Sequence, residues 1–434
     1  MPDFLYERRK MMNVISFINE YLTSPALTAV MICCGAYFTK KLRLYDPKKL
    51  IYAFTALKND KGVDGISPFS SLTVALAGTL GVGNIAGVAV AVSVGGAGAV
   101  FWMIVSSLLG ASLKYCEAYL TIKTRKKDRS GGAPIYIETL CKRKTGVVYA
   151  VLCVCASAVS GSFIQTNAAA SSLYLTLGVP KIVCGAVFAV LCAVIVLGGC
   201  ERVSSFTSAA MPLFCAVFFA MSVIAVSMRT AEIPAVVTRI FTEAFGFSAA
   251  AGGFSGAVVA SAVREGMTKG VFSHEAGCGT SSFSHAASSA SSPVAQGAVG
   301  IVEVLTDTLV FGGMTALVLL LSGEDGAGYD GMSYTISAYA RFFGTAASYM
   351  ICTLTVFFAF AAVICQSYYG CQAVKYITNK KSAEKAYVLL FSASLTLGAV
   401  ISPSFLWHLS DVVFAVMLFI NCACLICGRK MIKL

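Results

Sequence analysis

The amino-acid sequence predicts an all-α integral membrane protein, and two observations carry that prediction. Of the 434 residues, 57% are hydrophobic and only 12% are charged, whereas a soluble domain carries about 25% charged residues. The apolar residues also gather into runs of about 17 to 25 residues, the length of helix that crosses about 30 Å of hydrocarbon. No stretch between the runs is long enough for a soluble domain, so we expect one membrane domain over residues 1–434.

Eleven such runs can be counted along the chain. They cover residues 14–38, 69–93, 98–121, 147–176, 181–198, 206–228, 255–286, 295–322, 345–370, 386–400 and 404–427. The fifth and tenth runs are short, and polar residues interrupt the seventh. We therefore expect about eleven transmembrane helices.

Lysine and arginine are distributed unequally between the two sides of this topology. Of the 33 such residues, 23 lie on one side, seven on the other and three within runs. By the positive-inside rule the side with 23 is cytoplasmic, so the N-terminus is expected outside the cell membrane and the C-terminus inside. The net charge of +12 then reflects topology and contact with anionic lipid, and it does not indicate nucleic-acid binding. Trp102 and Trp407 fall near the outer ends of their runs, where interfacial anchors are common.

The 17 cysteines do not indicate a metal site or a disulfide framework. Most of them lie inside apolar runs, with neither CxxC pairs nor histidines at metal-binding spacing. We interpret them as small apolar packing residues.

The second run is interrupted by the sequence "GTLGVGN", residues 78–84. Glycine in a spanning helix either permits close packing of a neighbour or marks a point where the helix unwinds. Here the glycines come with Thr79 and Asn84, whose hydrogen-bonding groups a packing face does not need. An unwound segment offers N–H donors to a carboxylate and carbonyls to a cation, which together suit a zwitterion and an ion.

A second interruption, "AVREGMTKGVFSHEAGCGTSSFSHA" at 262–286, places charged residues and glycines at membrane depth. Paired interruptions in two halves are typical of transporters built as inverted repeats. We expect residues 69–228 and 255–427 to form two five-helix halves of opposite orientation, with 14–38 as a peripheral helix.

Several ordered motifs resemble the alanine/glycine:cation symporters, also called sodium:alanine symporters. They are "GNIAGVAVAVSVGGAGAVFWM" (83–103), "GGAPIYI" (131–137), "QTNAAA" (165–170), "GVFSHEAGCG" (270–279), "DTLVFGGMTALVLL" (307–320) and "SYYG" (367–370). The resemblance implies a LeuT-like fold with two broken helices and one additional N-terminal helix. It also implies sodium-coupled import of small neutral amino acids such as alanine, glycine and serine by alternating access.

The chain departs from that family pattern at three places. Val82 replaces a threonine at the first interruption, and His274 replaces an asparagine at the second. Ala361 and Ala362 stand where the family usually shows a Ser/Thr pair whose hydroxyls help to coordinate sodium. Because alanine offers no oxygen ligand, the shared sodium site lacks two of its groups, and a proton gradient or exchange are alternative driving forces.

The candidate site residues follow from the two interruptions and the matching motifs. The substrate-binding candidates are Thr79, Gly81, Gly83, Asn84, Gln165, Asn167, Ser273, Gly277, Gly279 and Thr280. The coupling candidates are Thr79, Leu80, His274, Glu275 and Asp307. We expect the substrate carboxylate at the N–H groups of 81–84 and its amine near Gln165 and residues 273–279. Apart from a sodium ion no cofactor is expected, and the expected partners are a small neutral amino acid and lipid.

Each of these candidates also has a structural interpretation. Gln165 and Asn167 can hydrogen-bond between helices, and Glu275 can pair with Arg264 or Lys269. Asp307, which we place near the start of its run, is expected to cap a helix rather than to join a gate network.

Lys114 and Glu117, three residues apart, suit an ion pair at the cytoplasmic end of one helix. We assign that pair no role in transport.

Two other functional classes fit the sequence less well. A channel needs a continuous ring of filter groups, usually supplied by an oligomer. A membrane enzyme needs a nucleophile with its base or a metal motif, and His274-Glu275 has no histidine at the spacing of HExxH.

The two alanines generate a prediction about coupling. We expect alanine uptake by the unmodified protein to respond to a proton gradient or to counter-substrate more than to sodium. Replacing Ala361 with Ser and Ala362 with Thr should increase the sodium dependence of uptake into proteoliposomes, because it restores two hydroxyl ligands. Glu275 or His274 is then the expected proton carrier. The alternative is a sodium site built elsewhere from Asn84, Glu275 or Thr280, and steep, saturable sodium activation of the unmodified protein would contradict the prediction.

Overall fold

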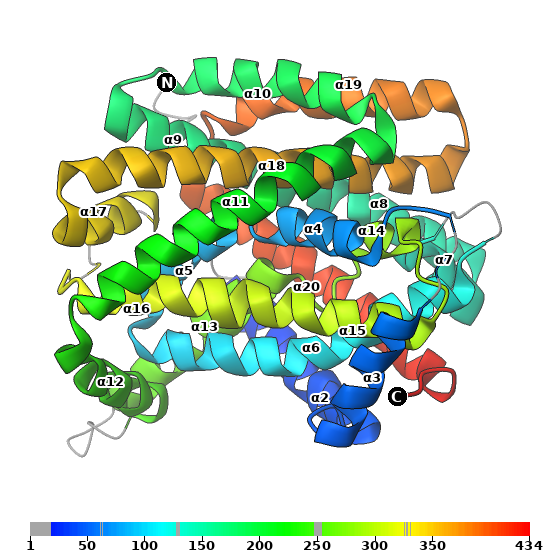
Figure 1. Cartoon of the computed structure of the whole chain (residues 1–434), viewed down its shortest axis with the longest axis horizontal. Coiled ribbons are helices and arrows are strands. Elements are labelled where there is room, and N and C mark those ends of the chain that lie inside the picture. The colour runs from blue at the N-terminus through cyan, green and yellow to red at the C-terminus, as the bar shows by residue number, and fades with distance from the viewer. Residues whose placement is uncertain are drawn as a thin grey trace.

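The computed structural model describes residues 19–60, 62, 64–126, 131–246, 254–324, 326, 329 and 331–434. Within these residues every regular element is a helix, and the one β-bridge joins Ile66 to Ser288. Several long helices lie nearly parallel to one another along the long axis of the molecule and form its body, while another long helix slants across them (Figure 1).

The helices are α2 (Ser24–Leu42), α3 (Pro47–Asn59), α4 (Pro68–Thr79), α5 (Ala86–Gly95), α6 (Gly98–Thr124), α7 (Ala133–Leu140), α8 (Arg143–Ala156), α9 (Gln165–Leu177), α10 (Lys181–Val196), α11 (Gly199–Ser227), α12 (Ile233–Phe245), α13 (Phe254–His274), α14 (Ser282–Ala287), α15 (Pro293–Val304), α16 (Gly313–Leu321), α17 (Gly331–Phe343), α18 (Thr345–Thr378), α19 (Lys381–Gly398) and α20 (Pro403–Cys427).

The protein is an all-helical membrane protein, as the composition predicts. In the described part of the chain, seven helices are long and apolar enough to cross a bilayer, and an eighth crossing is formed if the bent pair α4–α5 counts as one span. Helices also occupy the other predicted runs, with α10 as a shorter apolar helix. Residues 14–18 of the first run lie outside the described residues, and eleven crossings stays a prediction.

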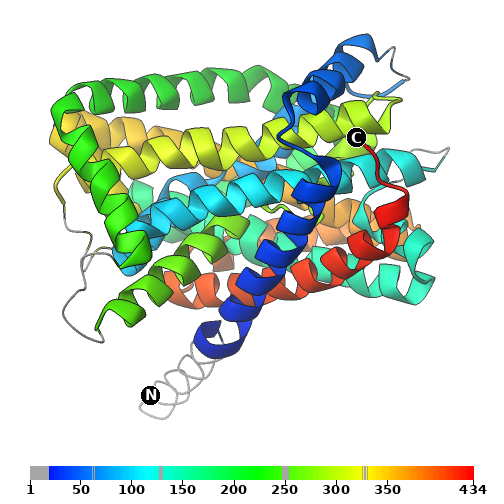
Figure 2. The ribbon, with the colours of Figure 1, turned by 90° about the horizontal axis from the view of Figure 1, so that it is seen from below.

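Four helices that the hydrophobic runs do not predict lie at the two ends of the bundle. Helices α3 and α7 lie at the end that holds the C-terminus, and α12 and α17 lie at the opposite end (Figure 1). We call these the α7 end and the α17 end. The first long helix, α2, crosses one face of the bundle obliquely, where it packs on α6 and α20 (Figure 2).

The first predicted interruption is a sharp break. Helix α4 ends at Thr79, a short 3₁₀ turn spans Val82–Asn84 (η2), and α5 leaves at an angle of 58° to α4. The second interruption lies between α13 and α14, over residues 275–281. There Gly277 and Gly279 adopt positive φ, and so does Glu275, at 49°. A positive φ is uncommon for a residue other than glycine, so Glu275 is held by its surroundings.

Two helices beside the breaks contain π-helical segments. Segment η3 (Ser157–Ile164) joins α8 to α9, and η5 (Leu305–Gly312) joins α15 to α16. A π turn closes on the fifth residue rather than the fourth, and such turns are frequent at functional sites. Both segments lie close to candidate residues, because Gln165 follows η3 directly and Asp307 lies within η5.

The contact between α6 and α13 is one of the closest in the bundle. At Gly266 a β-carbon would lie 2.6 Å from the Trp102 β-carbon and would also meet the Ala99 carbonyl oxygen. Small residues at such positions let two membrane helices pack backbone to backbone.

We therefore predict that Gly266→Ala lowers the stability of the protein by about 1–3 kcal/mol, because the added methyl group forces the two helices apart. Thermal unfolding of the purified protein in detergent measures the effect. Gly256→Ala is the matched control, since it lies on the same helix and a β-carbon there meets nothing within 4 Å. Equal melting temperatures for the two variants would contradict the prediction.

Candidate functional site at the two helix breaks

Gln165 lies directly against the first break. Its Oε1 accepts a hydrogen bond of 2.9 Å from the backbone N–H of Val82, and the side chain is almost fully buried. A β-carbon at Gly81 would lie 2.7 Å from the Gln165 Nε2. Glycine at 81 therefore gives the amide access to the break. One of the N–H groups that we expected for a substrate carboxylate is used by Gln165 in this structure.

Four buried side chains form an oxygen-rich cluster where α13 and η5 meet the first break. We call Asn84, Ser273, Asp307 and Thr308 the Asp307 cluster. The Asn84 Nδ2 donates to Asp307 Oδ1 at 2.7 Å, and the Ser273 and Thr308 hydroxyls donate to Oδ2 at 2.6 and 2.8 Å. Ser273 also lies 3.0 Å from Asn84 Oδ1. Residues from three separate segments thus converge on one carboxylate.

The position of Asp307 corrects an expectation. The helix that carries it begins at Pro293, so Asp307 lies in the middle of α15–η5–α16 and cannot cap that helix. The hydrophobic run 295–322 did not show that Asp307 lies in the middle of the helix and faces Asn84, because a hydrophobic pattern does not reveal a π segment.

Glu275 is bound at the second break by partners other than the expected ones. Its Oε1 accepts from the Gln366 Nε2 at 2.9 Å, and its Oε2 accepts from the Thr280 hydroxyl. The structural alternative for Glu275, a pairing with Arg264 or Lys269, is not what the structure shows. Arg264 pairs with Glu265, and Lys269 pairs with Asp411 on α20.

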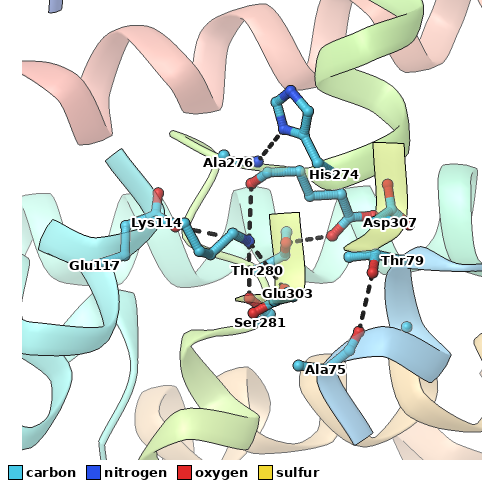
Figure 3. A network of polar contacts seen from close by, with 12 residues as sticks. Ala75, Thr79, Lys114, Glu117, His274, Ala276, Thr280, Ser281, Glu303 and Asp307 are labelled. Atoms are coloured by element: carbon cyan, nitrogen blue, oxygen red, sulfur yellow. Dashed lines mark hydrogen bonds and ion pairs between the residues drawn. The ribbon is translucent and has the colours of Figure 1, made fainter. Parts of the chain in front are cut away.

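Lys114 and Glu117 also differ from expectation. Both side chains are fully buried, and their Nζ to Oε2 distance is 3.8 Å. Lys114 donates to Ser281 Oγ at 2.8 Å, and Glu117 accepts from the Gly279 N–H at 2.9 Å (Figure 3). The pair is therefore not an isolated contact at a helix end but part of the second break.

Other groups of the second break are held by the surrounding scaffold. The Gly277 carbonyl accepts from Asn421 at 2.8 Å, and the Cys278 carbonyl accepts from Tyr149 at 2.5 Å. His274 turns away from the neighbouring carboxylates, with Nδ1 accepting from the Ala276 N–H at 2.9 Å and Nε2 lying 3.1 Å from the Ser106 hydroxyl (Figure 3). Each of these polar groups is satisfied within the protein.

Three of the remaining candidates lie in helical surroundings. Asn167 donates to the carbonyls of Gly398, Ala399 and Ile401 at 3.1, 3.3 and 2.7 Å, and so holds the end of α19. This contact matches the helix-to-helix alternative for Asn167. The Thr79 hydroxyl donates to Ala75 of its own helix at 3.2 Å, and the Leu80 N–H donates to Leu76 at 2.6 Å.

Ala361 and Ala362 are fully buried in α18. One turn further along, Gln366 Nε2 lies 3.4 Å from the Gly78 carbonyl oxygen at the end of α4. The alanine side chains at 361 and 362 carry no oxygen atom, whereas a metal cation such as sodium needs oxygen ligands.

A cavity of about 410 Å³ is lined by residues of α5, α13, α17 and α20. Its lining includes Lys269 and Asp411, whose Nζ to Oδ distances are 3.0 Å, and Trp407, over whose ring Lys269 lies at 5.0 Å. Trp407 packs edge-on against Phe272, with ring centroids 4.6 Å apart. Trp407 thus points into the protein, which corrects its expected role as an interfacial anchor.

Some residues of this region were missed by sequence reasoning. Glu303 binds His285 at 2.9 Å, His285 lies 2.7 Å from Gln296, and Gln296 donates to Ser71 at 3.1 Å. The signal was present in each case as a polar residue inside an apolar run, the same signal that drew attention to Gln165. What the sequence lacks is any indication of which polar residues meet.

The chain belongs to the sodium:alanine symporter family, whose model matches residues 8–433. It is 33% identical over 433 residues to an uncharacterized transporter of Haemophilus influenzae, covering 97% of this chain and 94% of the relative. It is 32% identical over 422 residues to the sodium/alanine symporter AgcS of Methanococcus maripaludis, covering 92% and 90%. The protein is therefore a member of a family of cation-coupled amino acid transporters and not an enzyme.

The fold is LeuT-like, as the resemblance implied. It is similar to that of MhsT, solved in complex with L-phenylalanine, with a TM-score of 0.62 at 14% identity. The similarity covers 83% of this chain and 89% of MhsT. At this level of identity the likeness concerns the fold alone.

The close approach of Gln165 to Gly81 predicts the effect of a bulky residue there. We expect Gly81→Leu to abolish amino acid uptake while membrane insertion is retained, because the new side chain displaces the amide from the break. Radiolabelled alanine uptake and the yield of monodisperse protein measure the two effects. Gly313→Leu is the control, since a β-carbon at Gly313 meets nothing within 4 Å. Near-normal uptake by Gly81→Leu would contradict the role that we give to the contact between Gln165 and the first break.

Proposed function

We propose that the protein imports small neutral amino acids, such as alanine, glycine and serine, by alternating access and in symport with a cation. Its LeuT-like fold and its family support transport of an amino acid. The observation that carries the proposal is that a broken helix, a buried amide and a buried carboxylate cluster meet at one place. These are Gln165 at Val82 and the Asp307 cluster at Asn84.

The substrate site is proposed at the first break, between α4 and α5. The amino acid carboxylate meets the N–H groups of residues 81–84, and Gln165 moves from the Val82 N–H to the substrate amine. A β-carbon at Gly83 would lie 3.3 Å from the Phe272 ring, and one at Gly87 would lie 3.4 Å from Trp407. These aromatic rings leave room for a small side chain and exclude a bulky one.

The cation site is proposed at the Asp307 cluster. It offers a carboxylate, an amide oxygen and two hydroxyl oxygens, and all four side chains are buried. Hard cations prefer oxygen ligands, and a carboxylate supplies the charge that stabilises a buried ion. Sodium is the proposed ion, and this proposal replaces the sequence-based expectation that a proton gradient or exchange outweighs sodium. The reason is that the Asp307 cluster supplies the oxygen ligands that the alanine side chains at 361 and 362 lack.

The proposed topology follows the charge distribution. The α7 end is cytoplasmic and the α17 end is outside, so the cavity of about 410 Å³ is the outer entrance. Residues 69–228 and 255–427 form the two inverted five-helix halves, and residues 14–38 form the peripheral helix. Phe272 and Trp407 close the route between the entrance and the first break.

We predict that Asp307→Asn raises the sodium concentration for half-maximal alanine uptake by about tenfold or more, a factor that corresponds to about 1.4 kcal/mol. The reason is that the variant keeps the hydrogen-bonding shape but loses the charge. Uptake into proteoliposomes is measured under a sodium gradient, under a proton gradient and with alanine inside for exchange. Glu275→Gln is the matched control, because it removes a buried charge at the second break.

Two outcomes would contradict this assignment. If Glu275→Gln removes cation activation and Asp307→Asn retains it, the coupling group lies at the second break. If the unmodified protein responds to the proton gradient and not to sodium, Asp307 is a proton carrier and not a sodium ligand.

A further inference from the structure

The ammonium group of Lys114 occupies a cage of oxygen atoms at the second break. Its Nζ lies 2.8 Å from Ser281 Oγ, 3.4 Å from the Glu275 carbonyl oxygen, 3.3 Å from Glu303 Oε1 and 3.8 Å from Glu117 Oε2. Lys114, Glu117 and Glu303 have no exposed side-chain surface. Figure 3 shows the lysine side chain reaching from α6 to this point, where contacts from both sides of the break meet.

The cage has the composition of a cation site. It contains two carboxylates, a backbone carbonyl and a hydroxyl, which are the groups that bind hard metal ions in proteins. One positive group therefore faces two negative ones at full burial, where charge that is not compensated is costly. Lys114 supplies the compensation from within the chain.

The lysine also connects the two ends of the break. Its contact with Glu275 lies on the α13 side, and its contact with Ser281 lies on the α14 side. Three residues further along α6, Glu117 accepts from the Gly279 N–H between them. Helix α6 thus holds the unwound segment at three points along its length.

Neighbouring glycines make room for this arrangement. A β-carbon at Gly300 on α15 would lie 3.0 Å from the Lys114 carbonyl oxygen and 3.1 Å from its side-chain Cγ. Because Gly300 has no side chain, α15 can approach α6 closely and bring Glu303 to the ammonium group. The position of the lysine is therefore built into the packing of two helices.

We propose that the Lys114 ammonium is a resident internal cation that holds the second break in shape, in the place where a free ion would otherwise be needed. Lys114 is a positioning residue, because it acts through the backbone of residues 275–281. The inference rests on the proposed function, which assigns the exchangeable cation to the Asp307 cluster. Of these two buried sites, only the Asp307 cluster then exchanges its ion during transport.

The test is to remove the Lys114 side chain and to supply a cation from solution in its place. Lys114→Ala is purified in detergent, and its thermal unfolding is measured with ammonium, methylammonium, sodium or potassium chloride against N-methylglucamine chloride at equal ionic strength. We expect a lower melting temperature than that of the unmodified protein. Ammonium or methylammonium should restore part of it in a saturable manner, and the unmodified protein should show no such response.

Two further variants separate charge from shape. Lys114→Met retains most of the side-chain volume without the charge, and it should be destabilised without rescue because the cage is filled. Lys114→Met combined with Glu303→Gln removes one charge of each sign, and it should be more stable than Lys114→Met alone. If Lys114→Ala fails to fold, the comparison of these two variants still tests the proposal.

The proposal is overturned if neither ammonium nor methylammonium raises the melting temperature of folded Lys114→Ala. It is also overturned if Lys114→Met is as stable as the unmodified protein, or if the added Glu303→Gln gives no recovery. Sodium bound at the Asp307 cluster stabilises the unmodified protein and the variants alike, so a sodium response that they share does not bear on the resident cation. Suppose that Asp307→Asn loses sodium activation and that ammonium does not raise the melting temperature of Lys114→Ala. This combination would refute the resident-cation proposal and leave the assignment of Asp307 in place.

Discussion

A helix that unwinds inside a bilayer exposes backbone groups that have no water to bind, and this constraint determines much of the surrounding structure. Around the second break, side chains from α6, α8 and α20 take up those groups, namely Glu117 at Gly279, Tyr149 at Cys278 and Asn421 at Gly277. Around the first break, Gln165 accepts from the Val82 N–H, Gln366 Nε2 lies 3.4 Å from the Gly78 carbonyl oxygen, and the Thr335 hydroxyl donates to the Ile85 carbonyl at 3.1 Å. Side chains of neighbouring helices thus bind backbone groups at both breaks.

The buried charges follow the same logic. Lys269 and Asp411 pair at 3.0 Å in the lining of the 410 Å³ cavity, and Lys114 lies among carboxylates near the second break. The desolvation free energy of two buried charges is often larger than the free energy gained from their attraction. Such pairs therefore contribute little net stability. What these ion pairs fix is the arrangement of the helices, because Lys269 with Asp411 and Lys114 with Glu303 each join two different helices. A helix that shifts along its neighbour leaves a charge without its partner.

Much of the fold could be predicted from the sequence because hydrophobic runs report directly on crossing a bilayer. The interruptions at 78–84 and 262–286 were also visible, since glycine beside polar residues is costly in a spanning helix unless the helix unwinds, although α13 continues to His274 and the second break covers only 275–281. The partners at each break were not visible. Lys114 was expected only in an ion pair at the end of one helix and Trp407 as an anchor, because a hydrophobic pattern gives the depth of a residue but not the helix that it faces. Asp307 was misplaced for a related reason, since nothing in the sequence marked the π segment that turns it inward.

The π segments η3 and η5 have a consequence for how the family can vary. Each π turn accommodates an additional residue without lengthening the helix by a full turn, so the portion that follows is rotated by about 100° relative to an uninterrupted α-helix. Deleting a single amino acid within η3 would convert the segment to regular α-helical geometry and rotate Gln165 to another face of its helix. Alignments of relatives that place a one-residue gap here therefore carry information about the orientation of Gln165, although that residue itself has not been exchanged.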